Sequence, residues 1–215
     1  MALLQKTFPL LKPSILLFSF ICLLYSQTLN SPWQFDDYDN ITENLKIHMH
    51  VLNWASIKAS LYATPSCENT LYRPVSNFSL ALNWFLGKDD VTGYHLVNIA
   101  IHILTALILY LTVIQLMKTP NAGSWDQEKI YSISLLSAIL WAIHPIQIQA
   151  VTYIVQRMAS LAAFFYIMGI FLFFKSPYGQ RSFVSNNFYR TMWSFFFYWG
   201  SVQKTMPYSF PHSYC

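Results

Sequence analysis

The residues best suited to do chemistry lie in one short run, residues 35–44, which holds four carboxylates: Asp36, Asp37, Asp39 and Glu43. Two adjacent carboxylates can raise the pKa of one of them, which suits a general base that takes a proton from a weak nucleophile. The same residues would also fit a solvated loop that caps a helix. The run directly follows an apolar segment, residues 10–29, that is long enough to cross a bilayer, so it lies just outside the predicted membrane span.

Composition indicates a membrane protein. Of the 215 residues, 54% are hydrophobic and 18% aromatic, only 10% are charged, and the mean hydropathy is +0.34. Soluble proteins carry about a quarter charged residues, so this chain has too few to cover a globular surface. The net charge is +4, but the basic residues form no dense patch, so we expect no nucleic-acid partner.

The apolar runs predict an all-α, polytopic membrane protein, a helical bundle with spans at about 10–29, 94–117, 130–144 and 158–174 and a partial fifth at 191–200. The core of the first run, residues 15–24, also suits a signal peptide of about ten apolar residues, but the wider window favours an uncleaved span. His144-Pro145 interrupts the third run. His102 lies inside the second, where a neutral histidine packed between helices and a proton relay are both possible.

Basic residues concentrate in segments that share one predicted side of the membrane: the N-terminus and the loops 118–129 and 175–190. These residues are Lys6, Lys12, Lys118, Lys129, Lys175, Arg181 and Arg190. The acidic loop 30–93 lies on the other side, although it also carries lysines and an arginine. Because short loops rich in Lys and Arg stay in the cytoplasm, we expect loop 30–93 to be extracytoplasmic.

The outer loop contains two shorter apolar stretches, residues 47–62 and 75–86, with helical spacing. They are too short or too polar to span, so we expect helices in the membrane interface with Trp54 and Trp84 at headgroup level. Pro74 suits a first helical turn. His48 and His50 would point apart on a helix, so we expect no metal site there. Of the cysteines, a Cys67–Cys215 disulfide is possible, but no spacing favours it.

Three blocks of sequence, taken in order, carry a resemblance to a known family. They are FDDYDNITEN at 35–44; YRPVSNFSLALNWFLG at 72–87 with GYHLVN at 93–98 and His102; and LWAIHPIQIQAVTYIVQR at 140–157. Together they resemble the N-terminal part of bacterial membrane proteins with C-terminal tetratricopeptide repeats. Those proteins are similar to the eukaryotic transmembrane and tetratricopeptide-repeat-containing O-mannosyltransferases, within the C-type glycosyltransferases.

The resemblance implies transfer of a mannose-like sugar from a polyprenyl-phosphate donor to a protein or glycan hydroxyl, with inversion. In that family an acidic residue of the first outer loop acts as base or positions the acceptor, and the matching positions are Asp36 and Asp37. Arg73, His144 and Arg157 are candidates to bind the donor phosphate or the acceptor. The implied partners are membrane lipid, the lipid-linked sugar and the acceptor; no cofactor is certain, and a divalent metal stays possible.

The resemblance covers about residues 10–200 and fades after residue 204, so we expect a transferase-like domain at 1–200 and a divergent tail at 201–215, in a truncated chain. Two other functions stay open: a non-catalytic remnant or membrane scaffold, and a transporter or assembly subunit for lipid-linked sugars. We expect the bacterial inner membrane, or the endoplasmic reticulum membrane in a eukaryote. In a eukaryote, the sequons Asn40-Ile-Thr and Asn77-Phe-Ser would be candidate N-glycosylation sites.

Overall fold

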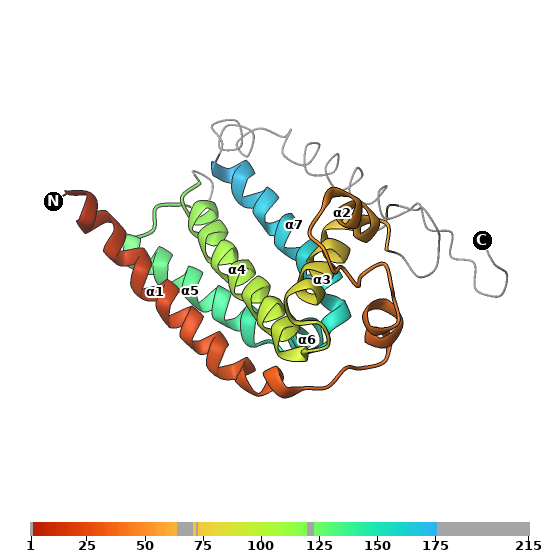
Figure 1. The fold of residues 1–215 in the computed structure, drawn as a ribbon. Helices are drawn as coiled ribbons and strands as arrows, with labels where there is room; N and C mark the ends of the chain where they lie inside the picture. Colours follow the sequence, from red (N-terminus) through yellow and green to blue (C-terminus); the bar gives the residue numbers. More distant parts are fainter. Residues whose placement is uncertain (1, 64–70, 72, 120–122, 176–215) are drawn as a thin grey trace, which may run out of the picture.

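The computed structural model describes residues 2–63, 71, 73–119 and 123–175, and within these ranges it contains helices and no strand (Figure 1). The prediction of an all-α, polytopic membrane protein is confirmed. The long helices are α1 (Ala2–Tyr25), α4 (Val91–Met117), α5 (Gln127–Ile143) and α7 (Arg157–Lys175). The shorter ones are η1 (Ser26–Asn30), η2 (Tyr38–Thr42), α2 (Trp54–Leu61), α3 (Pro74–Gly87), α6 (Ile146–Thr152) and η4 (Ile154–Gln156).

Three segments are long and apolar enough to cross a bilayer: Leu11–Asn30, Val91–Met117 and Ile154–Lys175. A fourth span is possible if α5 and α6, which are bent by 68° relative to each other, form one broken span. These segments correspond to the four main spans expected from the sequence. The partial span at 191–200, the tail at 201–215 and both cysteines of the possible disulfide lie outside the described residues.

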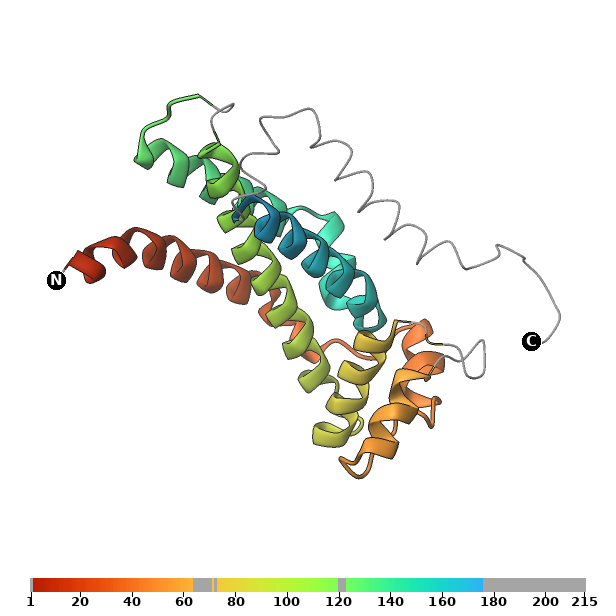
Figure 2. The same cartoon turned by 90° about the horizontal axis from the view of Figure 1, so that it is seen from above.

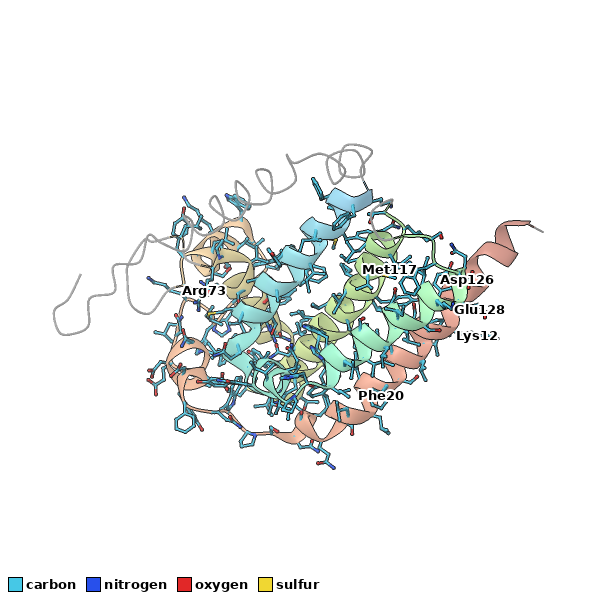
Figure 3. All side chains as sticks on the ribbon, turned by 180° about the vertical axis from the view of Figure 1, so that it is seen from behind. Lys12, Phe20, Arg73, Met117, Asp126 and Glu128 are labelled. Atoms are coloured by element: carbon cyan, nitrogen blue, oxygen red, sulfur yellow. The ribbon has the colours of Figure 1, made fainter. Side chains whose placement is uncertain are left out.

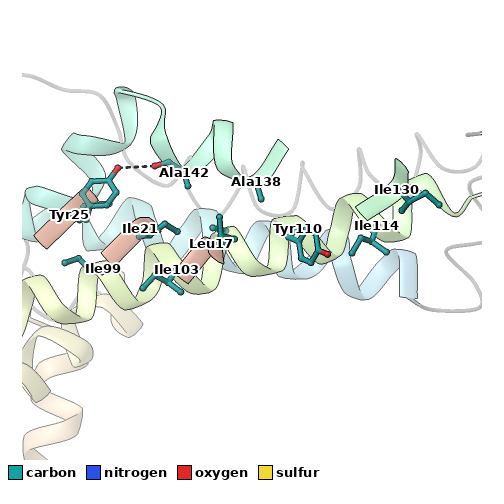
Figure 4. Packing of buried hydrophobic residues seen from close by; sticks show 12 residues of the cluster. Leu17, Ile21, Tyr25, Ile99, Ile103, Tyr110, Ile114, Ile130, Ala138 and Ala142 are labelled. Carbon is teal, nitrogen blue, oxygen red and sulfur yellow. Dashed lines mark hydrogen bonds between the residues drawn. The ribbon is translucent and has the colours of Figure 1, made fainter. Parts of the chain in front are cut away.

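Helix α4 lies at the centre of the bundle and packs against α1, α5 and α7 (Figure 1). Its apolar face meets the buried side chains of α1 and α5 along most of its length (Figure 4). Among membrane helices such packing gives mainly van der Waals contact, because lipid tails are as apolar as the side chains themselves. The buried cluster comprises Leu17, Ile21, Tyr25, Ile99, Ile103, Ala106, Tyr110, Ile114, Ile130, Ala138, Ala142 and Val151.

The break between α5 and α6 follows from Pro145. Proline has no N–H, so the carbonyl of Trp141 loses its usual partner and accepts instead from the N–H of His144 at 3.3 Å. The freed carbonyl of Ala142 accepts from the Tyr25 hydroxyl at 3.2 Å (Figure 4). It also accepts from Nε2 of His102 at 3.1 Å. Within a bilayer a broken helix is tolerated only when neighbouring groups satisfy its backbone. His102 therefore has a structural role as a donor to the break.

The loop between α1 and α4 folds into a small body with its own core, which we call the outer subdomain (residues 31–63 and 73–90). Figure 2 shows α2 and α3 side by side at one end of α4. The core of the outer subdomain packs against the start of α4 and against η4. The buried residues of this cluster are Ile41, Ile47, Met49, Ala63, Leu80, Ala81, Trp84, Tyr94 and Ile154.

Two expectations for this loop need correction. The first helix begins at Trp54 rather than near residue 47, because Asn53 adopts an extended conformation and its side chain accepts from the N–H of Ser56 at 2.8 Å. Trp84, expected at headgroup level, is instead buried and stacked on His48 with ring centroids 3.5 Å apart. Helix α3 begins with Pro74 in its first turn, as predicted.

The two ends of the bundle differ in the residues they carry. Lys12, Met117, Asp126 and Glu128 lie at one end, and Arg73 lies at the opposite end, with the outer subdomain (Figure 3). The N-terminal half of α1 therefore shares an end with Met117, Asp126 and Glu128, which is the arrangement that the charge pattern predicts. The side of the membrane that each end faces stays a prediction.

We predict that the Ala142 carbonyl makes the break sensitive to its two donors. Tyr25→Phe and His102→Leu should each lower the free energy of unfolding in detergent by roughly 0.5–1.5 kcal/mol. The double variant should lose more than the sum, because only then does the carbonyl have no donor. Tyr110→Phe is the matched control, since the buried Tyr110 hydroxyl has no hydrogen-bond partner within the described residues. Strict additivity, or an equal effect of the control, would contradict this assignment.

Candidate functional site

Five residues from the end of α6 to the first residue of α7, Tyr153 to Arg157, connect the three sequence blocks that carry the family resemblance. Tyr153 and Val155 hydrogen-bond to residues 36 and 37 of the first block. Arg157 hydrogen-bonds to side chains and carbonyls of the second block, in α3 and α4. We call residues 153–157 the clamp segment. It brings together residues that are more than 50 positions apart in the sequence.

Asp36 is exposed, but its backbone is held in place. Its N–H donates to the Tyr153 hydroxyl at 3.0 Å, and its carbonyl accepts from Nδ2 of Asn40 at 2.8 Å. Phe35, just before it, has a φ of 36°, which costs energy for a non-glycine residue and persists only where its surroundings hold it. Burial raises the pKa of the Tyr153 phenol, so that group stays neutral beside Asp36. The Asp36 carboxylate is thus presented to solvent from a fixed backbone.

Asp37 has a different environment, although it is the next residue. It is 1% exposed, one carboxylate oxygen accepts from the N–H of Val155 at 2.8 Å, and the other accepts from the N–H of Gln34 at 3.0 Å. Burial raises the pKa of Asp37 above its ordinary value of 3.8, while the two N–H bonds lower it in part. Asp37 thus fastens the acidic run to the clamp segment. Of the two aspartates, only Asp36 has the solvent exposure expected for the alternative of a solvated loop.

Arg157, expected to bind phosphate or acceptor, is completely buried. Its Nε donates to Oδ1 of Asn98 at 2.7 Å, and Nη1 donates to Oδ1 of Asn83 at 2.6 Å and to the Ser79 carbonyl at 3.2 Å. Nη2 donates to the Tyr94 carbonyl at 2.9 Å. A fork of donors that points in several directions is a property of arginine that lysine lacks. Here Arg157 joins α3, α4 and α7 and has no exposed surface for a substrate.

Arg73 and His144 remain exposed. Arg73 stands at the N-cap of α3 with a φ of 50°, and its Nη1 lies 2.8 Å from the sulfur of Met158, one residue beyond the clamp segment. His144 lies at the break, where its Nδ1 accepts from the N–H of Ile146 at 3.3 Å. The seven residues of α6, about 10 Å of helix, separate His144 from Tyr153. The structure thus brings Asp36, Asp37 and Arg157 together at the clamp segment, whereas Arg73 contacts Met158, the next residue along, and His144 stands apart.

A pocket of about 260 Å³ lies between α4, α5, α6 and α7. Its walls include His102, Thr105, Trp141, Gln147 and Ser160. None of the predicted site residues lines this pocket. The candidate site that the hydrogen bonds assemble is instead an exposed rim formed by residues 35–40 and the clamp segment.

Sequence reasoning missed the polar residues that hold this rim: Tyr153, Asn98, Asn83, Tyr94 and Ser79. The sequence did contain a signal for some of them, because burying an asparagine in an apolar helix costs free energy unless its side chain is hydrogen-bonded. Asn83 and Asn98 are such residues, and they lie in the second block. As for metals, the described residues include no group of three or more His, Cys, Asp or Glu side chains arranged to hold an ion.

We predict that Arg157 is required for folding. Arg157→Met should leave the side-chain oxygens of Asn83 and Asn98 buried without their Arg157 donors and should remove a second donor from the helical carbonyls of Ser79 and Tyr94, and we expect a cost of roughly 3–5 kcal/mol of unfolding free energy. Arg157→Lys should recover only part of this loss. The measurement is thermal unfolding in detergent, with Arg73→Met as the exposed control. Equal, small losses for Arg157→Met and Arg73→Met would show that the network stabilises little.

We predict a pH dependence from Asp37. A carboxyl with a raised pKa in the folded protein contributes stability fully below 3.8, its unfolded value, and loses that contribution as pH rises through the folded value. The free energy of unfolding of the wild type should therefore fall over the pH range just above 3.8, and Asp37→Asn should remove this part of the slope. Denaturant titrations at several pH values measure it. A slope of opposite sign would mean that the hydrogen bonds outweigh the burial.

The comparisons with known proteins agree with the resemblance noted in the sequence. The chain is 27% identical over 176 residues to protein O-mannosyl-transferase TMTC3 of Mus musculus, a match that covers 80% of this chain and 18% of that protein. It is 28% identical over 159 residues to protein O-mannosyl-transferase TMTC1 of Homo sapiens, covering 72% of this chain and 17% of that protein. A similar match, at 28%, is to protein O-mannosyl-transferase tmtc2 of Xenopus laevis.

No family model and no solved structure matches the chain. The chain spans less than a fifth of the length of the first of these relatives. The matched residues include most of the part that the structure describes. What the comparisons establish is therefore similarity to proteins named O-mannosyltransferases, over most of this chain.

Proposed function

We propose that this chain provides the outer rim of a membrane glycosyltransferase that moves a mannose-like sugar from a polyprenyl-phosphate donor to a hydroxyl of a protein or glycan. The observation that carries the proposal is the contrast between Asp36 and Asp37. The Asp36 carboxylate is exposed while its backbone N–H is hydrogen-bonded, and the Asp37 carboxylate is buried and hydrogen-bonded to the clamp segment. Similarity to proteins named O-mannosyltransferases supports it. The exposed rim lies at one end of a bundle of membrane helices, where a donor carried by a membrane lipid could reach it.

In this proposal Asp36 is the general base. An acceptor hydroxyl is a poor nucleophile, so its oxygen attacks the anomeric carbon while the Asp36 carboxylate takes its proton. The bond between that carbon and the phosphate oxygen breaks, and the polyprenyl phosphate leaves as an anion. Attack opposite the leaving group inverts the anomeric centre. Asp37 is a positioning residue, because both of its oxygens are already occupied by backbone N–H groups.

The leaving phosphate needs a cation or donor near it. We assign this role to Arg73, which is exposed at the head of α3 and lies beside Met158 at the start of α7. His144 is a second candidate, at the break between α5 and α6. We do not assign it to Arg157, since all of its surface is covered by the protein.

For location, we propose the endoplasmic reticulum membrane with the outer subdomain in the lumen. The relatives reported above are animal proteins, which favours this membrane over the bacterial inner membrane. The basic N-terminus and 118–129 connection would then face the cytosol.

The test is transfer of radiolabelled mannose from polyprenyl-phosphate mannose to a peptide rich in serine and threonine, by membranes that contain the protein. Asp36→Asn should lower the rate by about 10²–10⁴-fold, the usual contribution of a general base, without changing thermal stability. Asp39→Asn, an exposed carboxylate of the same run, is the matched control and should retain activity. Arg73→Met should lower the rate at all donor concentrations.

If Asp36→Asn and Asp39→Asn transfer mannose equally well, Asp36 is not the base. If the wild type transfers no sugar although it is folded and correctly inserted, the chain serves instead as a membrane scaffold or an assembly subunit. The clamp segment would then have a structural purpose only.

A further inference from the structure

Two glycosylation sequons remain outside the proposed function, and the fold places them in different environments. Asn40-Ile-Thr42 lies in and around η2, on the rim that presents Asp36. Asn77-Phe-Ser79 lies in α3, where Asn77 is 4% exposed and the Ser79 carbonyl accepts from buried Arg157. An oligosaccharide on Asn77 would have to enter the interior of the outer subdomain, so this fold leaves no room for it.

We propose that Asn40 is a site of N-linked glycosylation, that Asn77 is not, and that the glycan on Asn40 shields Asp36. The first two parts rest on a lumenal outer subdomain. The importance of the shielding for catalysis rests on the proposed function. The chemistry is that of a protein in a compartment that contains an oligosaccharyltransferase, and the ligand is an oligosaccharide carried on a polyprenyl diphosphate.

The geometry of the turn supports Asn40 as the acceptor. Asn40 is half-buried, and the carboxylates around it, on Asp36, Asp39 and Glu43, are exposed, so an attached sugar would meet solvent. Ile41, the middle residue of the sequon, is fully buried and anchors the turn. Ten residues separate Asn40 from Asn30, the end of the first span, and this length can reach roughly 33–36 Å from the bilayer. The acceptor amide can therefore clear the membrane surface before the turn closes.

In the transfer, the oligosaccharide moves from its polyprenyl diphosphate carrier to the side chain of Asn40. Nδ2 of Asn40 forms a bond to C1 of the first sugar, and the bond from C1 to the diphosphate oxygen breaks. The lipid diphosphate leaves with the electron pair, and one proton is lost from Nδ2 to the oligosaccharyltransferase. One N–H remains, which is enough to keep the hydrogen bond to the Asp36 carbonyl. The glycosylated nitrogen would then lie 2.8 Å from the carbonyl oxygen of Asp36, which attaches the first sugar close to the Asp36 residue.

The full chain, translated in the presence of endoplasmic reticulum microsomes, tests the site. We expect one shift in gel mobility that an endoglycosidase removes. Asn40→Gln and Thr42→Ala should abolish the shift, whereas Thr42→Ser, which keeps the sequon and a hydroxyl that can donate to the Tyr38 carbonyl, should retain it. Asn77→Gln should also retain it. No shift in the wild type, or a shift that persists in Asn40→Gln, would overturn the assignment.

The shielding of residue 36 by the glycan is tested separately, by the chemical reactivity of a cysteine at that position. With Cys22, Cys67 and Cys215 replaced by serine, Asp36→Cys should react several-fold faster with a membrane-impermeant maleimide when Asn40 is changed to Gln than when the glycan is present. Equal rates would overturn the shielding. Neither measurement needs sugar transfer by this chain. Loss of mannosyl transfer together with a clear glycan shift would therefore count against the proposed function alone.

Discussion

The outer half of the molecule depends on the hydrogen bonds of the clamp segment, residues 153–157. Every second residue of this segment hydrogen-bonds to a different part of the chain. Tyr153 binds the backbone of Asp36, Val155 binds the side chain of Asp37, and Arg157 binds α3 and α4. A buried guanidinium is stable only when its donors are satisfied. Because the acceptors come from separate helices, satisfying Arg157 fixes how the outer subdomain sits on the bundle.

This arrangement gives adjacent aspartates different tasks. An exposed carboxylate on a loop is mobile unless something holds its backbone, and catalysis needs a group held close to its working geometry. Asp37 and Tyr153 supply that restraint from either side of the Asp36 peptide. The break at Pro145 contributes as well, since it redirects the chain into α6 and brings Tyr153 beneath the acidic run. Tyr25 and His102 satisfy the backbone at the break and so make that change of direction possible.

Much of the fold could be predicted from the sequence, because apolar runs and their lengths determine membrane helices directly. The proline break and the start of α3 were also predictable, since Pro145 and Pro74 act through local backbone chemistry. The extent of α2 was not, because the cap at Asn53 outweighs the helical spacing of the preceding residues. Nor was the role of Arg157, since its acceptors come from α3 and α4, and only the fold brings them together. The burial of Trp84 and Asp37 has the same cause: both depend on contacts between distant segments.

The most direct test of this account is amide hydrogen exchange in the clamp segment, measured by mass spectrometry on the protein in detergent. The N–H of Val155 donates to Asp37, so residues 153–157 should exchange slowly in the wild type. In Asp37→Ala the same residues should exchange much faster, while the centre of α4 keeps its protection. Equal exchange in both proteins, or fast exchange of residues 153–157 in the wild type, would contradict the claim that Asp37 fastens the acidic run to this segment.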